Sequence, residues 1–400
     1  LLAFGSNFAV KRTASPPLTL AVRHPGHTLY LHHRLGSNLE MSEPTINVQE
    51  TVNEAIEKAL KSRGIANVLI AGKTGVGKST LVNAVFQGRM AETGQGRPVT
   101  QHTRRISKEG VPVSIYDTKG LEIKDYKPIL EELLGFIKSQ NSQQDPQAHI
   151  HVAWLCIAEG SRRVEDAELS LVKQLATHIP VIVVITTAVA DGGFKKTVQE
   201  LMPEARNVVR INSLPQPLDG GITIAQHGLQ DLVEITMEVM PDGQKNAFAA
   251  AQRVALQQKV NQAHKVVAAA ATAAATAAAV PVPFSDALAI VPIQISMLAG
   301  ISACFGLDVS KGFLGTVVSG SFSSLAGTLG GRAAVGALLK FFPGIGSVAG
   351  GVVSATVATA LTVAFGEAYI ATLQGLLKEN PDRQLSGQEV ADAFKKRMDA

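Results

Sequence analysis

The first half of the chain alternates between short, continuous apolar runs and longer segments whose apolar residues recur at helical spacing. Continuous runs are typical of strands buried on both faces, and the segments between them are typical of covering helices. Strands that alternate with helices in this way predict an α/β fold with a mostly parallel sheet. The expected strands are 68–71, 111–116, 150–157 and 181–186, with a weaker one at 208–211.

A helix is also expected before the first strand, within residues 44–63. Its apolar residues Val52, Ile56, Ala59 and Leu60 fall on one face, and Gly64 follows as a stop signal. We expect this face to pack beside the first strand. A helix at 227–240 is expected to close the domain.

Beyond residue 243 the pattern changes to uncharged stretches of 20 to 26 residues, at 266–285, 287–307, 312–331 and 341–366. Each is long enough to cross the roughly 30 Å hydrocarbon core of a membrane as a helix. The first stretch is largely alanine, however, and prolines interrupt the region, so a tightly packed bundle in water fits the same pattern. Small residues spaced four apart at 327–331 and 346–350 allow close helix contact in either setting. The sequence therefore predicts an all-α, Ala/Gly-rich domain and leaves membrane insertion open.

These changes predict four parts: an extension at 1–43, the α/β domain with its preceding helix at 44–243, the apolar helical domain at 244–378, and a charged ending at 379–400. The extension has basic but no acidic residues over 1–39, as disordered tails and organelle targeting segments do. The ending has helical spacing around Val390, Phe394 and Met398, and we expect it to be a solvated tail.

Charge and cysteine content narrow the functional classes. The net charge of +4 equals the charge of Lys11, Arg12, Arg23 and Arg34 within residues 1–39, so residues 40–400 are neutral overall. The basic isoelectric point therefore does not indicate a nucleic-acid surface. Only Cys156 and Cys304 are present, which argues against a disulfide framework and favours a reducing compartment such as the cytoplasm.

The segment Gly72–Ser79 has the spacing G-x-x-x-x-G-K-S, between the first strand and a helical segment at 80–86. Glycines at these positions let successive backbone N–H groups surround a phosphate at the positive end of the following helix. Lys78 is expected to reach the β and γ oxygens, and Ser79 to bind Mg²⁺ through its hydroxyl. The predicted nucleotide-binding residues of this segment are Gly72, Lys73, Thr74, Gly75, Val76, Gly77, Lys78, Ser79 and Thr80.

A second group of residues follows the strand at 111–116. Asp117 stands at its carboxyl end, where a second contact to Mg²⁺ is expected, and Gly120 would offer an N–H to a γ-phosphate. The Gly/Pro-rich loop at 94–103 comes just before and is either an idle connection or a switch.

The residues described so far resemble the translation-factor-like, HSR1-related class of P-loop GTPases. The segments Pro98–Thr103, Tyr116–Glu122 and Ile150–Cys156 are similar to members with a C-terminal DUF697-type domain, which is related to the bacterial YcjF membrane protein. The resemblance implies that the chain binds GTP and Mg²⁺. It also implies that Thr100 or Thr103 is the switch threonine; Thr100 is taken as a metal ligand and, with Lys78 and Gly120, as a catalytic residue. The C-terminal domain of this family is suspected of membrane contact.

The base-reading motif departs from the family pattern. Members have N/T-K-x-D after the fifth strand, where the lysine covers guanine and the aspartate accepts its N1 and N2 protons. This chain has Thr186-Thr-Ala-Val189 there. Losing such a charge-assisted hydrogen bond costs about 1.5–3 kcal/mol, or tenfold or more in discrimination. Asp191 is a candidate substitute, and Asn212-Ser213 is either the remaining base-loop element or a simple turn.

Catalysis is the second departure. Ras-like GTPases have a water-orienting glutamine after D-x-x-G, whereas this chain has Leu121, which predicts slow turnover unless a dimer mate or activating protein positions the water. Arg162 and Arg163 are expected to be a solvated pair, with a catalytic contribution to a second molecule as the alternative.

The leading interpretation is a slow GTPase that acts as a nucleotide-dependent switch on the apolar helical domain. The alternative is a membrane or assembly scaffold with a vestigial or base-unselective site, which would admit ATP. A P-loop kinase or ATPase is less well supported because no lid or arginine finger can be assigned. The expected location is cytoplasmic, with membrane association or organelle targeting as the other settings.

Overall fold

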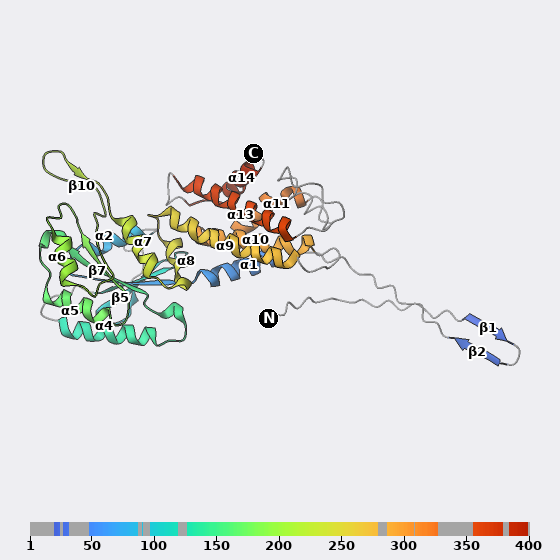
Figure 1. The fold of residues 1–400 in the computed structure, drawn as a ribbon, viewed down its shortest axis with the longest axis horizontal. Coiled ribbons are helices and arrows are strands. Elements are labelled where there is room, and N and C mark those ends of the chain that lie inside the picture. The colour runs from blue at the N-terminus through green and yellow to red at the C-terminus, as the bar shows by residue number, and fades with distance from the viewer. Residues whose placement is uncertain are drawn as a thin grey trace. The chain divides into compact units, whose positions relative to one another are not determined.

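The computed structural model describes residues 20–24, 27–31, 48–86, 90, 97–118, 126–278, 286–307, 309–326, 355–378 and 384–398. The chain forms two units, residues 1–46 and residues 47–400 (Figure 1). The described part of the first unit is a hairpin in which β1 (Leu20–His24) pairs antiparallel with β2 (His27–Leu31). A two-stranded hairpin buries little apolar surface of its own.

The main sheet of the second unit has the strand order β4-β5-β6-β3-β7-β8-β9. The strands from β6 to β9 in this order are parallel, whereas β5 is antiparallel to β6 and β4 to β5. This arrangement confirms the predicted α/β fold with a mostly parallel sheet. The strand bounds are β3 (Ala66–Ala71), β4 (Arg97–Pro98), β5 (Thr103–Ser107), β6 (Val113–Thr118), β7 (Val152–Ala158), β8 (Val181–Thr186) and β9 (Asn207–Arg210).

Helices cover both faces of this sheet (Figure 1). In β7, Trp154 and Cys156 belong to the buried cluster on one face, and Leu155 and Ile157 to the cluster on the other. Because both faces are covered, both sets of alternating side chains must be apolar, which explains the continuous runs in the sequence. One face is covered by α2 (Lys78–Val85), α7 (Leu229–Val239) and α8 (Asp242–Ala251), and the other by α4 (Tyr126–Asn141), α5 (Asp166–Leu175) and α6 (Phe194–Leu201).

The strands at one edge were not expected from the apolar pattern. β5 contains Arg104 and Arg105 between its buried residues Thr103 and Ile106. These two arginines interrupt the apolar alternation of β5, which lies between β4 and β6. A short hairpin of β10 (Gln216–Pro217) and β11 (Thr223–Ile224) follows β9.

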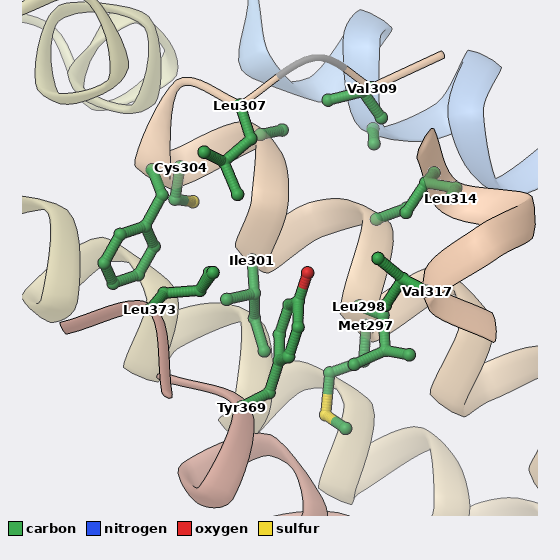
Figure 2. Close-up of a cluster of buried hydrophobic side chains, with 14 of the residues drawn as sticks. Met297, Leu298, Ile301, Cys304, Leu307, Val309, Leu314, Val317, Tyr369 and Leu373 are labelled. Carbon is green, nitrogen blue, oxygen red and sulfur yellow. The ribbon is translucent and has the colours of Figure 1, made fainter. Parts of the chain in front are cut away.

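The helical part has a core of its own. In Figure 2, Leu298 and Ile301 of α10 lie among Leu314 and Val317 of α11 and Tyr369 of α13. The Tyr369 hydroxyl is 2.8 Å from the Ser302 hydroxyl, so the polar end of this buried ring is satisfied. The helices are α1 (Val48–Arg63), α9 (Leu256–Ala278), α10 (Asp286–Phe305), α11 (Lys311–Ala326), α13 (Ala355–Leu377) and α14 (Gly387–Met398).

The four predicted uncharged stretches correspond to α9, α10, α11 and α13, although their bounds shift. α9 begins at Leu256, earlier than predicted, and α13 begins at Ala355, later than predicted. Pro292 lies inside α10 and does not end it. The small-residue spacings at 327–331 and 346–350 fall outside the described residues.

The expectation that the helix before the first strand packs beside that strand is wrong. Val52, Ala55, Ile56 and Ala59 of α1 are buried in the helical core, where α1 packs against α10. The spacing identified Val52, Ile56 and Ala59 correctly, whereas Leu60 is 41% exposed. Periodicity carries no information about which surface covers a buried face. The α/β domain is therefore inserted in the sequence between α1 and the other helices of the same core.

The expectation of a solvated tail at the C-terminal end is also wrong for the described residues of that segment. Val390, Ala391 and Phe394 of α14 are buried, and the ring of Phe394 packs at 5.1 Å from the rings of both Phe365 and Tyr369. α14 is amphipathic and lies against α11 and α13, which supply the apolar surface that its sequence alone does not reveal.

Within the described residues, one helix, α13, is long and apolar enough to cross a membrane. Half of its apolar window is buried against the rest of the protein. A core helix of a globular domain can have the same length and composition. The length and composition of α13 therefore do not distinguish a membrane-spanning helix from a core helix.

Candidate functional site

The phosphate loop, residues 72–79, connects the carboxyl end of β3 to the first turn of α2. Gly72, Gly75 and Gly77 all have positive φ, of 139°, 80° and 94°. A Cβ at Gly72 would lie 2.4 Å from the carbonyl oxygen of Cys156, so only glycine fits against β7 there. The backbone conformation that the motif predicts is therefore present.

The loop curls around the Lys78 ammonium. Lys78 Nζ donates hydrogen bonds to the carbonyl oxygens of Gly72, at 2.7 Å, and Lys73, at 3.0 Å. An ammonium held by loop carbonyls is pre-positioned to exchange them for the oxygens of a bound phosphate. Ser79 and Thr80 are exposed in the first turn of α2, and Thr74 is exposed in the loop. Val76 is instead buried, and Lys73 forms an ion pair with Glu165 at the start of α5.

Asp117 lies on β6, directly beside β3 in the sheet, with Ile70 as its register partner. Its Oδ2 accepts from Arg104 on β5, at 3.0 Å from Nε and 2.8 Å from a terminal nitrogen. Its Oδ1 is buried without a hydrogen-bond partner. A buried carboxylate oxygen with no partner is suited to accept from a metal-bound water, so the residues fit Mg²⁺ at this position.

The two candidate switch threonines lie in different environments. Thr103 is buried in β5, opposite Thr118, and is not available to a ligand. Thr100 lies in the turn between β4 and β5, where its hydroxyl oxygen accepts from the Thr103 N–H at 3.0 Å. The Thr100 side chain also bonds Glu132 of α4, and the ring of His102 lies 2.7 Å from the same carboxylate. In this conformation the turn is held against α4.

The other residues predicted around the γ-phosphate, Gly120 and Leu121, lie outside the described residues. The assignment of Gly120 to the γ-phosphate and the functional assignment of Thr100 therefore stay predictions.

The loop after β8, residues 187–191, which we call the base loop, is attached to the phosphate loop. The Thr186 hydroxyl at its start donates to the Val76 carbonyl oxygen at 2.6 Å. Thr187 has a positive φ of 50°, which is uncommon for a residue with a branched Cβ. A nucleotide with its phosphates on residues 72–79 would bring its base to this loop, at the carboxyl end of β8.

A buried carboxylate, Glu159, supports the base loop, and no motif in the sequence predicts it. Glu159 is 2% exposed and accepts from the N–H groups of Val189, at 2.6 Å, and Ala190, at 2.8 Å. It also accepts from Arg210 Nε at 2.7 Å. Burial raises the pKa of Glu159, but these hydrogen bonds outweigh the effect and hold the pKa below its ordinary value.

Arg162 and Arg163 are both exposed, as expected for a surface pair, but Arg162 also has backbone partners. Its guanidinium donates to the carbonyl oxygens of Ala190 and Asp191, while Arg163 is 75% exposed. Arg162 thus joins the loop after β7 to the base loop. No simple sequence signal marks this contact, because the partners are backbone atoms of a segment 28 residues away.

The Asp191 side chain is partly exposed and is held through one of its oxygens. Its Oδ1 accepts from the Lys195 N–H at 2.9 Å, in the first turn of α6, and lies 3.4 Å from Arg210 Nε. Asn212 donates its side-chain amide to the carbonyl oxygens of Ile224 and Ala225, so it holds the β10–β11 hairpin. Ser213 is buried, and its carbonyl oxygen accepts from Gln226.

Two cations link the phosphate-loop helix to the helical core. Arg253, between α8 and α9, donates to the carbonyl oxygens of Ala84, at 3.1 Å, and Asn83, at 2.7 Å, near the end of α2. Lys259 of α9 is buried and donates to Ala250 O of α8, at 2.8 Å, and Phe305 O of α10, at 3.1 Å. Cations at helix carboxyl ends are favourable because the last carbonyls carry partial negative charge.

The two cysteines are packing residues. Burial raises the pKa of both Cys156 and Cys304 to about 12, so both thiols stay neutral. A neutral, buried thiol is a poor nucleophile.

Two family models match the chain. Residues 67–187 match the family described as 50S ribosome-binding GTPase, and residues 244–398 match a domain of unknown function, DUF697. Cell division control protein 10 of Candida albicans is 25% identical over 244 residues, which cover 50% of this chain and 68% of that protein. Magnetosome membrane protein 22 of Magnetospirillum gryphiswaldense is 31% identical over 91 residues, 23% of this chain and 47% of that protein.

Among solved structures, the G domain of the FeoB iron transporter of T. maritima aligns with 44% of this chain and 98% of that domain. The two share 17% identity, with a TM-score of 0.28.

The phosphate-loop geometry and the two family matches agree on the domain content. The chain therefore contains a GTP-binding G domain of the HSR1-related kind, followed by a DUF697 helical domain.

Proposed function

We propose that this protein is a nucleotide-dependent switch, in which Mg²⁺ and GTP at the phosphate loop set the conformation of the DUF697 helices. The observation that carries the proposal is the pair of cations, Arg253 and Lys259, on either side of the start of α9. Arg253 contacts α2, whose first turn belongs to the phosphate loop, and Lys259 contacts α8 and α10. A change at the nucleotide thus has a continuous contact path to the helical core.

At the phosphates, the backbone N–H groups of residues 72–79 and the Lys78 ammonium would hold the β and γ groups. Ser79, Asp117 and Thr100 would hold Mg²⁺, which when bound neutralises charge on the phosphate oxygens. Asp117 can accept from a metal-bound water through its unpartnered Oδ1, whereas Thr100 must leave Glu132. That exchange would move the turn before β5, which is the kind of ordering step that a switch requires.

Hydrolysis would be slow in the isolated chain. The residue after Gly120 is Leu121, which cannot hold the attacking water by hydrogen bonding. We propose that an activating protein or a second copy of the chain supplies this interaction. Slow turnover suits a switch because the triphosphate-bound state persists long enough to act.

The α8 helix supports the transmission step. Phe248 of α8 packs edge-on against Phe86, at the end of α2, with ring centroids 5.8 Å apart. Phe86 also stacks on Trp154 of β7 at 5.7 Å. Close-packed contacts of this kind do not deform continuously, so displacement of α2 would move α8.

Hydrogen exchange on the full-length chain tests the proposal. With Mg²⁺, we expect GDP and a non-hydrolysable GTP analogue to give different amide protection in α9 and α10. Arg253→Ala should reduce that difference while nucleotide binding is retained. Lys265→Ala, which removes an exposed cation from α9, should leave the difference unchanged. Equal protection with the two nucleotides, in a protein shown to bind both, would refute the switch.

Lys78→Ala is the companion variant for the nucleotide site. It removes the ammonium at the centre of the phosphate loop, so it should abolish nucleotide binding and any nucleotide-dependent exchange. If this variant binds as tightly as the wild type, the phosphate loop is not the site, and the scaffold with a vestigial site becomes the better account.

Membrane association is a second proposal, and α13 is the observation that favours it. In the present fold, amphipathic α1 and α14 cover α10, α11 and α13, so insertion would require them to be displaced. Flotation of the full-length chain with phospholipid vesicles, in GDP and in the GTP analogue, tests this. Nucleotide-dependent flotation would support it, and failure to float in either state would count against it.

A further inference from the structure

The base loop contains one carboxylate, Asp191, and its Oδ1 already accepts from the Lys195 N–H. Val189 occupies the position where a carboxylate is expected, and its half-buried side chain has no acceptor atom. Guanine presents two adjacent donors, N1–H and the 2-amino group, whereas adenine presents an acceptor at N1. A side-chain acceptor at this position therefore favours guanine over adenine, and valine offers none.

Both oxygens of the nearest buried carboxylate, Glu159, already accept hydrogen bonds. Two backbone N–H groups of the base loop and Arg210 use its oxygens, and it is 2% exposed beneath the loop. Turning it toward a base would leave those two N–H groups and the guanidinium without their acceptor. Such a change is unfavourable because each lost partner leaves a buried polar group unsatisfied.

Asp191 is held by contacts of both its side chain and its backbone. Its side chain accepts from Lys195 at the start of α6, and its carbonyl oxygen accepts from both Arg162 and the Phe194 N–H. His227 adds a further restraint on the base loop, because its ring nitrogen lies 3.0 Å from the Ala188 carbonyl oxygen. A register change that brought Asp191 to the base would have to break these contacts together.

We propose that the nucleotide site is base-unselective: it takes purine nucleoside triphosphates, ATP as well as GTP, because Val189 replaces the carboxylate that would select guanine. The inference rests on the proposed nucleotide binding at the phosphate loop. Affinity then comes from the phosphates and Mg²⁺, which the two nucleotides share, and the base adds little discrimination. Val189 is the specificity-determining residue.

Competition binding on the full-length chain provides the test. Radiolabelled GTP with Mg²⁺ is displaced by unlabelled GTP, ATP or ITP, which lacks the 2-amino group. We expect the three dissociation constants to agree within about threefold, since one charge-assisted hydrogen bond corresponds to about tenfold or more. A preference for GTP over ATP of tenfold or more would overturn the inference.

A gain-of-selectivity variant gives the converse measurement. Val189→Asp should raise the ratio of GTP affinity to ATP affinity by about tenfold or more, with ITP between the two. Val189→Asn is the matched control, because asparagine has the shape of aspartate without its charge. It should raise the ratio of GTP affinity to ATP affinity less. Because the Val189 N–H contacts Glu159, a thermal melt checks that each variant is folded. If Val189→Asp does not fold, the ratio of GTP affinity to ATP affinity in the wild type decides the question.

The inference and the switch fail in different ways. If GTP is strongly preferred but nucleotides still change the exchange of α9 and α10, the inference fails and the switch stands. If ATP and GTP bind equally but neither changes the helices, the inference stands and the switch fails. Absence of any nucleotide binding would overturn both.

Discussion

Two glycines of the phosphate loop differ in what their missing side chains allow. Gly72 passes so close to β7 that a Cβ would overlap the Cys156 carbonyl oxygen, whereas a Cβ at Gly75 would meet nothing within 4 Å. Both have positive φ, so both would be strained by substitution, but only Gly72 has a steric reason as well. The motif spacing identifies both glycines, but it does not show that a steric clash applies to Gly72 and not to Gly75.

We therefore expect Gly72→Ala to destabilise the nucleotide-free protein by about 4 kcal/mol or more, since it combines a clash with backbone strain. Gly75→Ala should cost about 1–2 kcal/mol, the strain of a left-handed residue alone. Urea unfolding without nucleotide measures both. Equal losses for the two variants would show that the approach of Gly72 to Cys156 does not limit the substitution.

Glu159 is the residue whose charge the base loop depends on. Its pKa is lower in the folded protein than the ordinary value of 4.5, because the hydrogen bonds from Arg210, Val189 and Ala190 outweigh the effect of burial. A carboxylate with a lowered folded pKa adds stability above its unfolded pKa and loses it as the pH falls through the folded pKa.

Glu159→Gln should therefore be less stable than the wild type at pH 7, by about 1.5–3 kcal/mol for the lost charge-assisted hydrogen bond. The difference should shrink as the pH falls below 4.5, because the wild type then loses its own charge at this position. Thermal melts from pH 7 to pH 3 provide the comparison, with Glu200→Gln, at an exposed i,i+4 pair, as the unaffected control. A constant difference across this range would contradict the assignment.

At the scale of elements, short amphipathic helices decide how the apolar helices are covered. α14 supplies Phe394, which is fully buried between Phe365 and Tyr369, while Lys395 and Lys396 next to it are exposed. Its sequence is compatible with a solvated tail, because the buried face amounts to only a few residues. The helix is stabilised by tertiary packing rather than by local preference.

Phe394→Ala should cost about 3–5 kcal/mol, as expected for truncating a large buried ring. Lys395→Ala, one position along the same helix, should change stability by less than about 0.5 kcal/mol. Chemical denaturation of the full-length chain distinguishes them. If Phe394→Ala were as mild as its control, α14 would be a tail after all.

At the scale of the second unit, the G domain and the DUF697 helices share elements instead of meeting as separate bodies. α1 precedes the G domain in the sequence but packs in the helical core, and Gly64 and Ile65 connect it to β3. α8 belongs to the DUF697 match but buries Phe248 against the sheet cluster. The G domain is therefore tied to the helices at both of its ends, which favours transmission between them.

Ile56→Asp tests the placement of α1. It would put an unpaired charge into the helical core, so we expect a loss of about 4 kcal/mol or more in the stability of the helices. Leu60→Asp, on the same helix but 41% exposed, is the control and should stay within about 0.5 kcal/mol. Circular dichroism during urea unfolding reports the helical transition. Similar behaviour of the two variants would mean that α1 does not belong to this core.

The sequence alone determined the α/β fold, the phosphate loop and the apolar helices, because each is encoded in residues that are close together in the chain. Continuous apolar runs, glycine spacing and uncharged stretches are local signals of this kind. Strand β5 was not predicted, because its arginines interrupt the apolar pattern.

Only the tertiary structure decided which surface covers α1 and α14, that Arg104 holds Asp117, and that both oxygens of Glu159 already accept hydrogen bonds. The same is true of Arg253, whose partner Asn83 lies 170 residues earlier in the chain. A hydrogen bond across such a separation leaves no periodicity in the sequence, since it depends on where folding brings two distant segments together.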